Sequence, residues 1–141
     1  MKQVSAGIII CKNKILIARR NHHKSLSGLW EFPGGKQEEG ETLQECLKRE
    51  IMEELHLEIS VGDFLMQSIY EYEHGAICLN AYYAYADNDE INFHSDHDSI
   101  KWVTPIELDN YDFSPADIPI KNALKNLSLP LKMKYQGNTW F

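Results

Sequence analysis

Three glutamates are spaced so that together they could hold a metal ion, and an arginine beside them could orient their carboxylates. Glu50, Glu53 and Glu54 occupy positions i, i+3 and i+4, so on a helix their carboxylates meet on one face. Arg49 stands directly before them, and just upstream a glycine-rich loop from Phe32 to Lys36 supplies free backbone carbonyls. Such hard oxygen ligands suit Mg²⁺ or Mn²⁺.

The same glutamates could instead form a solvated acidic face of a helix. Repulsion between like charges and the helix dipole each cost only about 0.2–1 kcal/mol, so electrostatics alone does not exclude this alternative. We favour metal binding because Arg49 is placed to pair with Glu45 or Glu53 and so to fix the direction of the side chains.

The helix that would carry these residues is predicted to run from Leu43 to Leu55. Thr42 is a good N-cap, and Glu45 three residues later completes a capping box. Apolar residues recur at spacings of three and four, as a helix face against a core requires. They are Leu43, Cys46, Leu47, Ile51 and Leu55.

Strands are predicted on both sides of this helix. They are Val4–Cys11, Ile15–Ala18, Ile59–Tyr72, Ala76–Ala86 and Ile100–Val103. The first two form a hairpin, a polar loop spans Arg20–Gly28, and Pro115–Leu127 has a less regular helical pattern. This order predicts an α/β sandwich. We expect one domain over residues 1–127 and a C-terminal tail over 128–141.

Composition limits the class of protein. The 141 residues are 43% hydrophobic and 25% charged, which is typical of one globular domain. With no apolar run near 18 residues and no signal-peptide pattern, a cytoplasmic location is the default expectation. The three cysteines lack CxxC spacing and are predicted to be buried, reduced thiols.

The net charge of −7 argues against binding to nucleic acid polymers or to anionic membranes, which both attract basic surfaces. It does not exclude a small nucleotide. An acidic protein can bind a polyphosphate when divalent metal ions bridge the two sets of negative charge.

The segment from Gly35 to Leu57 resembles the Nudix box, G-x5-E-x7-R-E-U-x-E-E-x-G-U, where U is aliphatic. Five residues separate Gly35 from Glu41 and seven separate Glu41 from Arg49, and only the second glycine is replaced, by His56. Three flanking motifs are similar to the MutT branch of the Nudix hydrolases, which includes oxidised-nucleotide and CTP pyrophosphohydrolases. They are Ala18–Arg20, Leu29–Lys36 and Ser114–Pro119.

The resemblance implies a Nudix fold, in which a mixed β-sheet lies between helices with the motif helix on one face, and it implies roles for the motif residues. The Gly34 carbonyl and the carboxylates of Glu50, Glu53 and Glu54 would hold one or more Mg²⁺ ions, for which Mn²⁺ could substitute. Arg49 would orient the glutamates and Glu41 would brace the loop or bind an outer metal. Asp96 stands near a loop acid of related proteins that binds metal or acts as base. The implied substrate-binding residues are Arg20, Glu31, Phe32, Gly35, Lys36 and Asp117.

Several of these residues have alternative interpretations. Asp117 could accept hydrogen bonds from the N1–H and N2–H₂ donors of a guanine edge, or it could cap the last helix. Arg20 could be a surface charge rather than a group near phosphate or sugar, and Phe32 could be core. A solvated polar loop is an alternative to metal binding for the histidines and aspartates near Asp96. Related enzymes often carry an arginine close to the nucleotide base, near the start of the strand after the hairpin, whereas Glu73–Cys78 contains none.

The function predicted from the resemblance is Mg²⁺-dependent hydrolysis of a nucleoside triphosphate to a nucleoside monophosphate and pyrophosphate. The expected substrate is an oxidised purine nucleotide such as 8-oxo-dGTP, or CTP and its modified forms, and the expected state is a monomer or homodimer. The alternatives are a Nudix hydrolase of ADP-ribose or a dinucleotide, and a nucleotide-sensing module that binds without cleaving.

Overall fold

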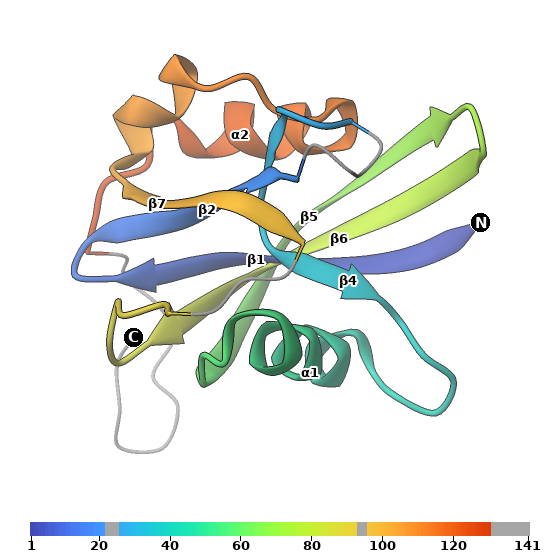
Figure 1. Ribbon diagram of the computed structural model, residues 1–141, viewed down its shortest axis with the longest axis horizontal. Coiled ribbons are helices and arrows are strands. Elements are labelled where there is room, and N and C mark those ends of the chain that lie inside the picture. The colour runs from blue at the N-terminus through green and yellow to red at the C-terminus, as the bar shows by residue number, and fades with distance from the viewer. Residues whose placement is uncertain (22–25, 93–95, 131–141) are drawn as a thin grey trace.

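In the computed structural model of the chain, which describes residues 1–21, 26–92 and 96–130, a mixed β-sheet lies between helices (Figure 1). The strands are β1 Lys2–Cys11, β2 Lys14–Arg20, β3 Trp30–Glu31, β4 Gly34–Lys36, β5 Ile59–Tyr72, β6 Gly75–Ala86 and β7 His97–Val103. The helices are α1 Leu43–Leu55 and α2 Ile118–Leu124, with 3₁₀ turns η1 Pro105–Asn110 and η2 Pro115–Asp117. The predicted α/β sandwich is confirmed.

Strand β1 lies at the centre of the sheet. It pairs in parallel with β6 along one edge, while its other edge pairs antiparallel with β4 near the start and with β2 at the end. Ser5 is opposite Gly35, and Ile10 is opposite Ile15. The two glycines of β4 are therefore fixed beside the middle of the sheet.

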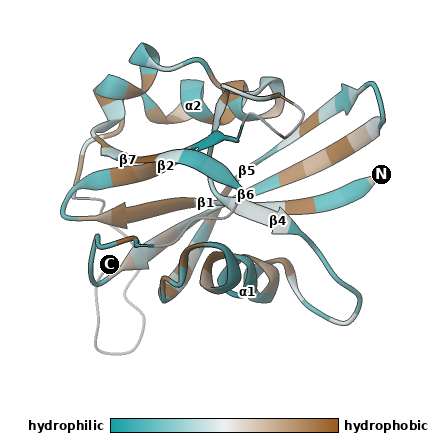
Figure 2. Cartoon of the chain, in the orientation of Figure 1, coloured by the Kyte–Doolittle hydropathy of each residue, from teal (hydrophilic) through white to brown (hydrophobic). Residues whose placement is uncertain are grey.

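Two hydrophobic cores lie on opposite faces of this sheet because residues along β1 alternate between the faces. Ile8 and Ile10 belong to the core that also contains Ile120 of α2, whereas Ile9 packs with Leu47 of α1 in the other core. Figure 2 shows the hydrophobic colour of β1 and the hydrophilic segment that follows β4. Each core holds one helix to one face of the sheet.

Helix α1 has the predicted bounds and the predicted cap. The Thr42 side chain accepts a hydrogen bond from the Glu45 backbone N–H, and the Glu45 side chain accepts one from the Thr42 N–H. His56 ends the helix at φ 51°, ψ 37°, so it takes the left-handed conformation that the missing glycine would have adopted.

The structure corrects four sequence predictions. Phe32–Lys36 is not only a loop, because Gly34–Lys36 pairs with β1 as a strand. Arg20 belongs to β2 rather than to the loop after it, since β2 is extended by pairing with β3 and β7. Strand β7 starts at His97, three residues before Ile100. The Pro115–Leu127 pattern is a 3₁₀ turn followed by a helix that starts at Ile118, where Pro119 is tolerated in the first turn.

The three cysteines are buried and free, as predicted. No helix within the described ranges has the length and apolar character needed to cross a membrane. Residues 131–141 of the predicted tail lie outside the described residues.

Candidate active site

The Gly34–Gly35 corner of β4 touches both β1 and α1. A Cβ atom added to Gly34 would collide with the Ser5 backbone carbonyl, and one added to Gly35 would collide with the Glu50 carboxyl group. The Gly35 carbonyl also accepts contacts from Ser5 Oγ and Cys46 Sγ, both at 3.4 Å. Only glycine allows the backbone and the Glu50 side chain to approach so closely.

Arg49 organises the acids around this corner. Its Nη2 and Nε donate to the two oxygens of Glu41 at 2.7 and 3.0 Å, and its Nη1 donates to Glu50 at 2.8 Å and to Glu53 at 3.2 Å. The predicted pair with Glu53 is confirmed. The alternative pair with Glu45 is wrong, because the capping box already uses the Glu45 carboxylate.

The acids near Arg49 differ in their electrostatics. Hydrogen bonds from Arg49 and from the Glu38 backbone lower the pKa of Glu41 to about 2. The pKa of Glu50 is raised, because its burial and the neighbouring Glu53 charge outweigh the contribution of Arg49. Arg49 therefore does not fully compensate the negative charge at Glu50. A half-buried carboxylate of this kind, next to backbone carbonyl oxygens, could bind a divalent cation.

Glu54 faces away from Arg49 and toward β7. Its Oε1 is 3.1 Å from His97 Nδ1 and accepts the Asp96 backbone N–H at 2.9 Å. The other ring nitrogen, His97 Nε2, lies 2.7 Å from Glu31 Oε2. The three motif glutamates are therefore divided between an arginine and a histidine.

His97 is buried, with 6% of its surface exposed, so the interpretation of this residue as part of a solvated loop is wrong. Burial alone would lower its pKa, but hydrogen bonds with Glu31 and Glu54 raise it to about 9. Asp96 is exposed beside Glu54, and Asp98 pairs with Arg19 at 2.6 Å. His94, the other histidine near Asp96, lies outside the described residues.

No three His, Cys, Asp or Glu side chains form a ready-made metal cage within the described part of the chain. The carbonyl of the Gly34–Gly35 corner and the carboxylates of α1 are hard oxygen donors, which are typical ligands of divalent cations such as Mg²⁺ or Mn²⁺. Mg²⁺ commonly keeps several waters and binds through one or two carboxylates together with substrate phosphates. The residues that could hold it are Gly34, Glu50, Glu53 and Glu54, with Asp96 nearby.

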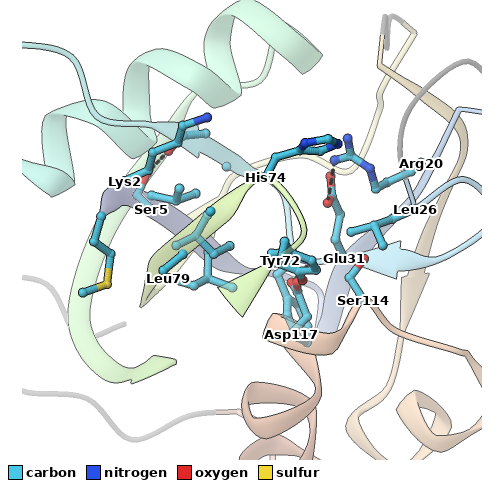
Figure 3. A pocket seen from close by; sticks show the side chains of 18 of the residues that line it. Lys2, Ser5, Arg20, Leu26, Glu31, Tyr72, His74, Leu79, Ser114 and Asp117 are labelled. Carbon is cyan, nitrogen blue, oxygen red and sulfur yellow. Dashed lines mark hydrogen bonds and ion pairs between the residues drawn. The ribbon is translucent and has the colours of Figure 1, made fainter. Parts of the chain in front are cut away.

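A cavity of about 820 Å³ opens on the other side of the Gly34–Gly35 corner (Figure 3). This volume lies within the usual range for small-molecule sites. Five of the six predicted substrate-binding residues line it, namely Arg20, Glu31, Phe32, Gly35 and Asp117, and so does Gly34, which was predicted as a metal ligand. Lys36 does not line it; its side chain is exposed at the end of β4, and its backbone carbonyl accepts from Arg49 at 3.2 Å.

Asp117 lies at the base of this cavity near Tyr72 (Figure 3). Its Oδ2 accepts the Phe32 backbone N–H at 3.0 Å, and it is only 5% exposed. It stands at the N-cap position of α2 without making a cap hydrogen bond, so the capping interpretation is wrong. Burial, with the nearby Glu31 charge, raises the pKa of Asp117.

The remaining cavity residues are fixed by packing and pairing. Arg20 is half-buried and pairs with Glu31 at 3.1 Å, which makes it part of the cavity wall rather than an isolated surface charge. Phe32 is 3% exposed and packs against Phe113 with ring centroids 5.0 Å apart, so its side chain belongs to the core. Tyr72, which accepts the Ala116 N–H at 3.0 Å, is a cavity residue that sequence reasoning missed.

Comparisons with known proteins agree with this geometry. The family model described as the NUDIX domain matches residues 5–123. The chain is 36% identical over 127 residues to the CTP pyrophosphohydrolase of Escherichia coli K12, covering 90% of this chain and 93% of that protein. It is 39% identical over 117 residues to a putative 8-oxo-dGTP diphosphatase 2 of Mycobacterium tuberculosis, covering 81% of each.

A solution structure of MutT, a Nudix family hydrolase of methicillin-resistant Staphylococcus aureus 252, matches with a TM-score of 0.70 at 39% identity. The match covers 88% of this chain and 95% of that one. The residues matched by the family model, 5–123, include helix α1 and most of the sheet and of α2.

Proposed function

Because the chain belongs to the Nudix hydrolase family and is a MutT-type hydrolase of phosphoric anhydride bonds, we propose that it is a Mg²⁺-dependent nucleoside triphosphate pyrophosphohydrolase. The proposed substrate is an oxidised purine nucleotide such as 8-oxo-dGTP, or CTP and its modified forms. The products are a nucleoside monophosphate and pyrophosphate.

The observation that carries this proposal is the position of the Gly34–Gly35 corner. The two glycines line the cavity, and the carboxyl group of Glu50 lies directly against Gly35. A nucleotide whose base occupies the cavity can therefore extend its phosphates across the corner to the acids of α1. One bound nucleotide could then contact both the proposed base-recognition site in the cavity and the proposed metal site on α1.

The proposed roles of the residues come from the resemblance to Nudix hydrolases, and the contacts described above support them. Gly34, Glu50, Glu53 and Glu54 are proposed to hold the metal, with Arg49 keeping Glu50 and Glu53 in place. The chemistry that a bound Mg²⁺ would supply there is activation of a water for attack on phosphorus and neutralisation of charge on the leaving phosphate. Asp96 is proposed as a further ligand or as the general base, and Arg20 as a contact to phosphate or sugar.

The proposed base contact is Asp117. Its Oδ2 is occupied by the Phe32 N–H, so its Oδ1 is the oxygen that would meet the base. In the ionised form Oδ1 accepts from a guanine N–H donor; in the protonated form the carboxyl group can donate to cytosine. The raised pKa of Asp117 supports the protonated form, which can donate to cytosine. Because the chain is similar both to a CTP pyrophosphohydrolase and to a putative 8-oxo-dGTP diphosphatase, we keep both substrate classes in the proposal.

A nucleotide panel tests this function. The purified protein is incubated with Mg²⁺ and 8-oxo-dGTP, dGTP, CTP, ADP-ribose or a dinucleoside polyphosphate. Phosphate and pyrophosphate are measured separately, and the nucleotide products, such as AMP from ADP-ribose, are resolved by chromatography. We expect pyrophosphate from 8-oxo-dGTP or CTP. Cleavage of ADP-ribose alone would move the assignment to another Nudix class, and nucleotide binding without any cleavage would indicate a sensing module.

A further inference from the structure

We propose that His97 is a positioning residue that fixes one acid of the substrate cavity and one acid of the metal site at the same time. The proposal rests on the function proposed above. His97 Nε2 lies 2.7 Å from Glu31 Oε2, and Nδ1 lies 3.1 Å from Glu54 Oε1. One imidazole ring thus joins the cavity wall to helix α1.

On the cavity side, His97 acts together with Arg20. Glu31 lines the cavity, and its two oxygens contact different partners, Oε1 meeting Arg20 at 3.1 Å and Oε2 meeting His97. A carboxylate held from both ends does not rotate freely. Glu31 therefore keeps a fixed place beside Asp117, and the shape and charge of the proposed base pocket depend on His97.

On the metal side, His97 acts together with the Asp96 backbone. Both the ring Nδ1 and the Asp96 N–H contact Glu54 Oε1, at 3.1 and 2.9 Å. Only 11% of the Glu54 side chain is exposed. Asp96 and His97, which both lie outside α1, therefore help to set the direction of this carboxylate. Groups that orient a metal ligand in this way strengthen metal binding about 10- to 100-fold.

Burial explains why both contacts are needed. His97 is 6% exposed, and a buried polar ring is costly unless its nitrogens have hydrogen-bond partners. Its partners are 66 and 43 residues away in the chain, one on β3 and one on α1. A ring needed only for packing could be apolar at this position, whereas this one links two acids from separate elements.

Two conservative substitutions separate the two contacts. The amide nitrogen of asparagine reaches the place of an imidazole Nδ1, and that of glutamine reaches the place of Nε2. His97→Asn therefore retains a donor toward Glu54 and loses the contact with Glu31. His97→Gln retains a donor toward Glu31 and loses the contact with Glu54.

The two variants should affect different measurements. For His97→Gln we expect Mn²⁺ binding to the nucleotide-free protein, measured by calorimetry, to weaken about 10-fold or more, with little change in KM at saturating metal. For His97→Asn we expect near-normal Mn²⁺ affinity and a KM raised several-fold. Asp98→Asn is the matched control, because Asp98 follows His97 in β7 and pairs with Arg19 instead. It should leave both quantities unchanged.

Thermal unfolding of every variant shows whether the fold is retained. If both His97 variants change Mn²⁺ affinity and KM by the same factor, or lower only the melting temperature, His97 is a structural residue and the proposal is overturned. The Mn²⁺ titration needs no turnover, so it tests the metal half even if the wild-type protein cleaves none of the nucleotides. Calorimetry with 8-oxo-dGMP and CMP then replaces KM for the cavity half.

Discussion

Arg49 contacts three of the acids on which the proposed metal chemistry depends. Its guanidinium group binds Glu41 through two hydrogen bonds, from Nε and Nη2, and reaches Glu50 and Glu53 through Nη1. Five donors in a rigid plane allow one arginine to serve several carboxylates, which a lysine could not do in the same way. Arg49 therefore holds like charges close together before any metal is bound.

Glu53 tests whether these acids take part in catalysis. Its side chain is 60% exposed, so Glu53→Gln should leave folding intact while removing one charge from the proposed metal site. We expect kcat to fall about 100-fold, the scale for losing a major electrostatic element. The control is Glu39→Gln, since Glu39 is exposed in the loop before α1 and lies outside the motif. A near-normal rate for Glu53→Gln would favour a solvated acidic face.

Asp117 tests which base the cavity accepts. In Asp117→Asn the amide oxygen can still accept the Phe32 N–H, and the amide then presents N–H₂ where the carboxyl presented Oδ1. If the wild-type carboxylate accepts hydrogen bonds from a guanine edge, kcat/KM for 8-oxo-dGTP should fall by an amount that corresponds to about 1–3 kcal/mol of transition-state stabilisation. The kcat/KM for CTP should stay the same or rise. Equal losses on both substrates would assign Asp117 a structural role, and a selective loss on CTP would reverse the base orientation.

At the scale of elements, β4 joins the cavity to α1, and its two glycines meet different obstacles. Gly35→Ala would push the Glu50 side chain, which can rotate away, so we expect a folded protein with kcat lowered about 10-fold or more. Gly34→Ala would collide with the backbone of Ser5 and should disrupt the pairing of β4 with β1. Thermal unfolding and turnover of both variants distinguish these effects. Wild-type turnover of Gly35→Ala would show that Glu50 does not need its place against Gly35.

Local signals explain which elements the sequence predicted. The bounds of α1 were predictable because Thr42 and Glu45 form the capping box within a few residues of each other. Strands β3 and β4 have two and three residues, too few for an alternating pattern, and they exist because β2 and β1 offer free edges. Helix α2 was predicted only in part. Proline is tolerated in the first turn of a helix, so α2 starts at Ile118, just before Pro119, and Pro115–Asp117 forms a separate 3₁₀ turn.

For the candidate site too, features that depend on local spacing were predicted from the sequence, whereas contacts between distant residues were not. The roles expected of Glu50 and Arg49 depend on spacing within one helix, which is readable from the sequence. The burial of His97 was missed because it depends on the pairing of β7 with β2 and on acids 66 and 43 residues away. The hydrogen bond from Phe32 to Asp117, across 85 residues, was likewise invisible in the sequence pattern.

At the scale of the whole molecule, the two cores are separate from the proposed metal site. Leu47, Ile51 and Leu55 attach one face of α1 to the sheet, whereas Arg49 and Glu53 lie on its solvent side. The opposite core is closed by Ile120 and Leu124 of α2. Burial of such side chains contributes about 1.5–3 kcal/mol each, and none of these side chains is a proposed metal ligand, so we expect the fold to form without a metal ion.

Metal removal should therefore abolish activity without unfolding the protein. With an excess of EDTA we expect nucleotide hydrolysis to fall by at least about 100-fold, because the acidic site and the triphosphate would otherwise repel each other and the leaving group would lack a neutralising charge. The melting temperature should change little, since both hydrophobic cores are intact. Adding Mg²⁺ or Mn²⁺ should restore the rate, whereas Zn²⁺ alone should not, because the ligands are hard oxygens in an open site. Undiminished hydrolysis in EDTA would refute the metal assignment, and unfolding in EDTA would mean that the acids of α1 hold a structural ion.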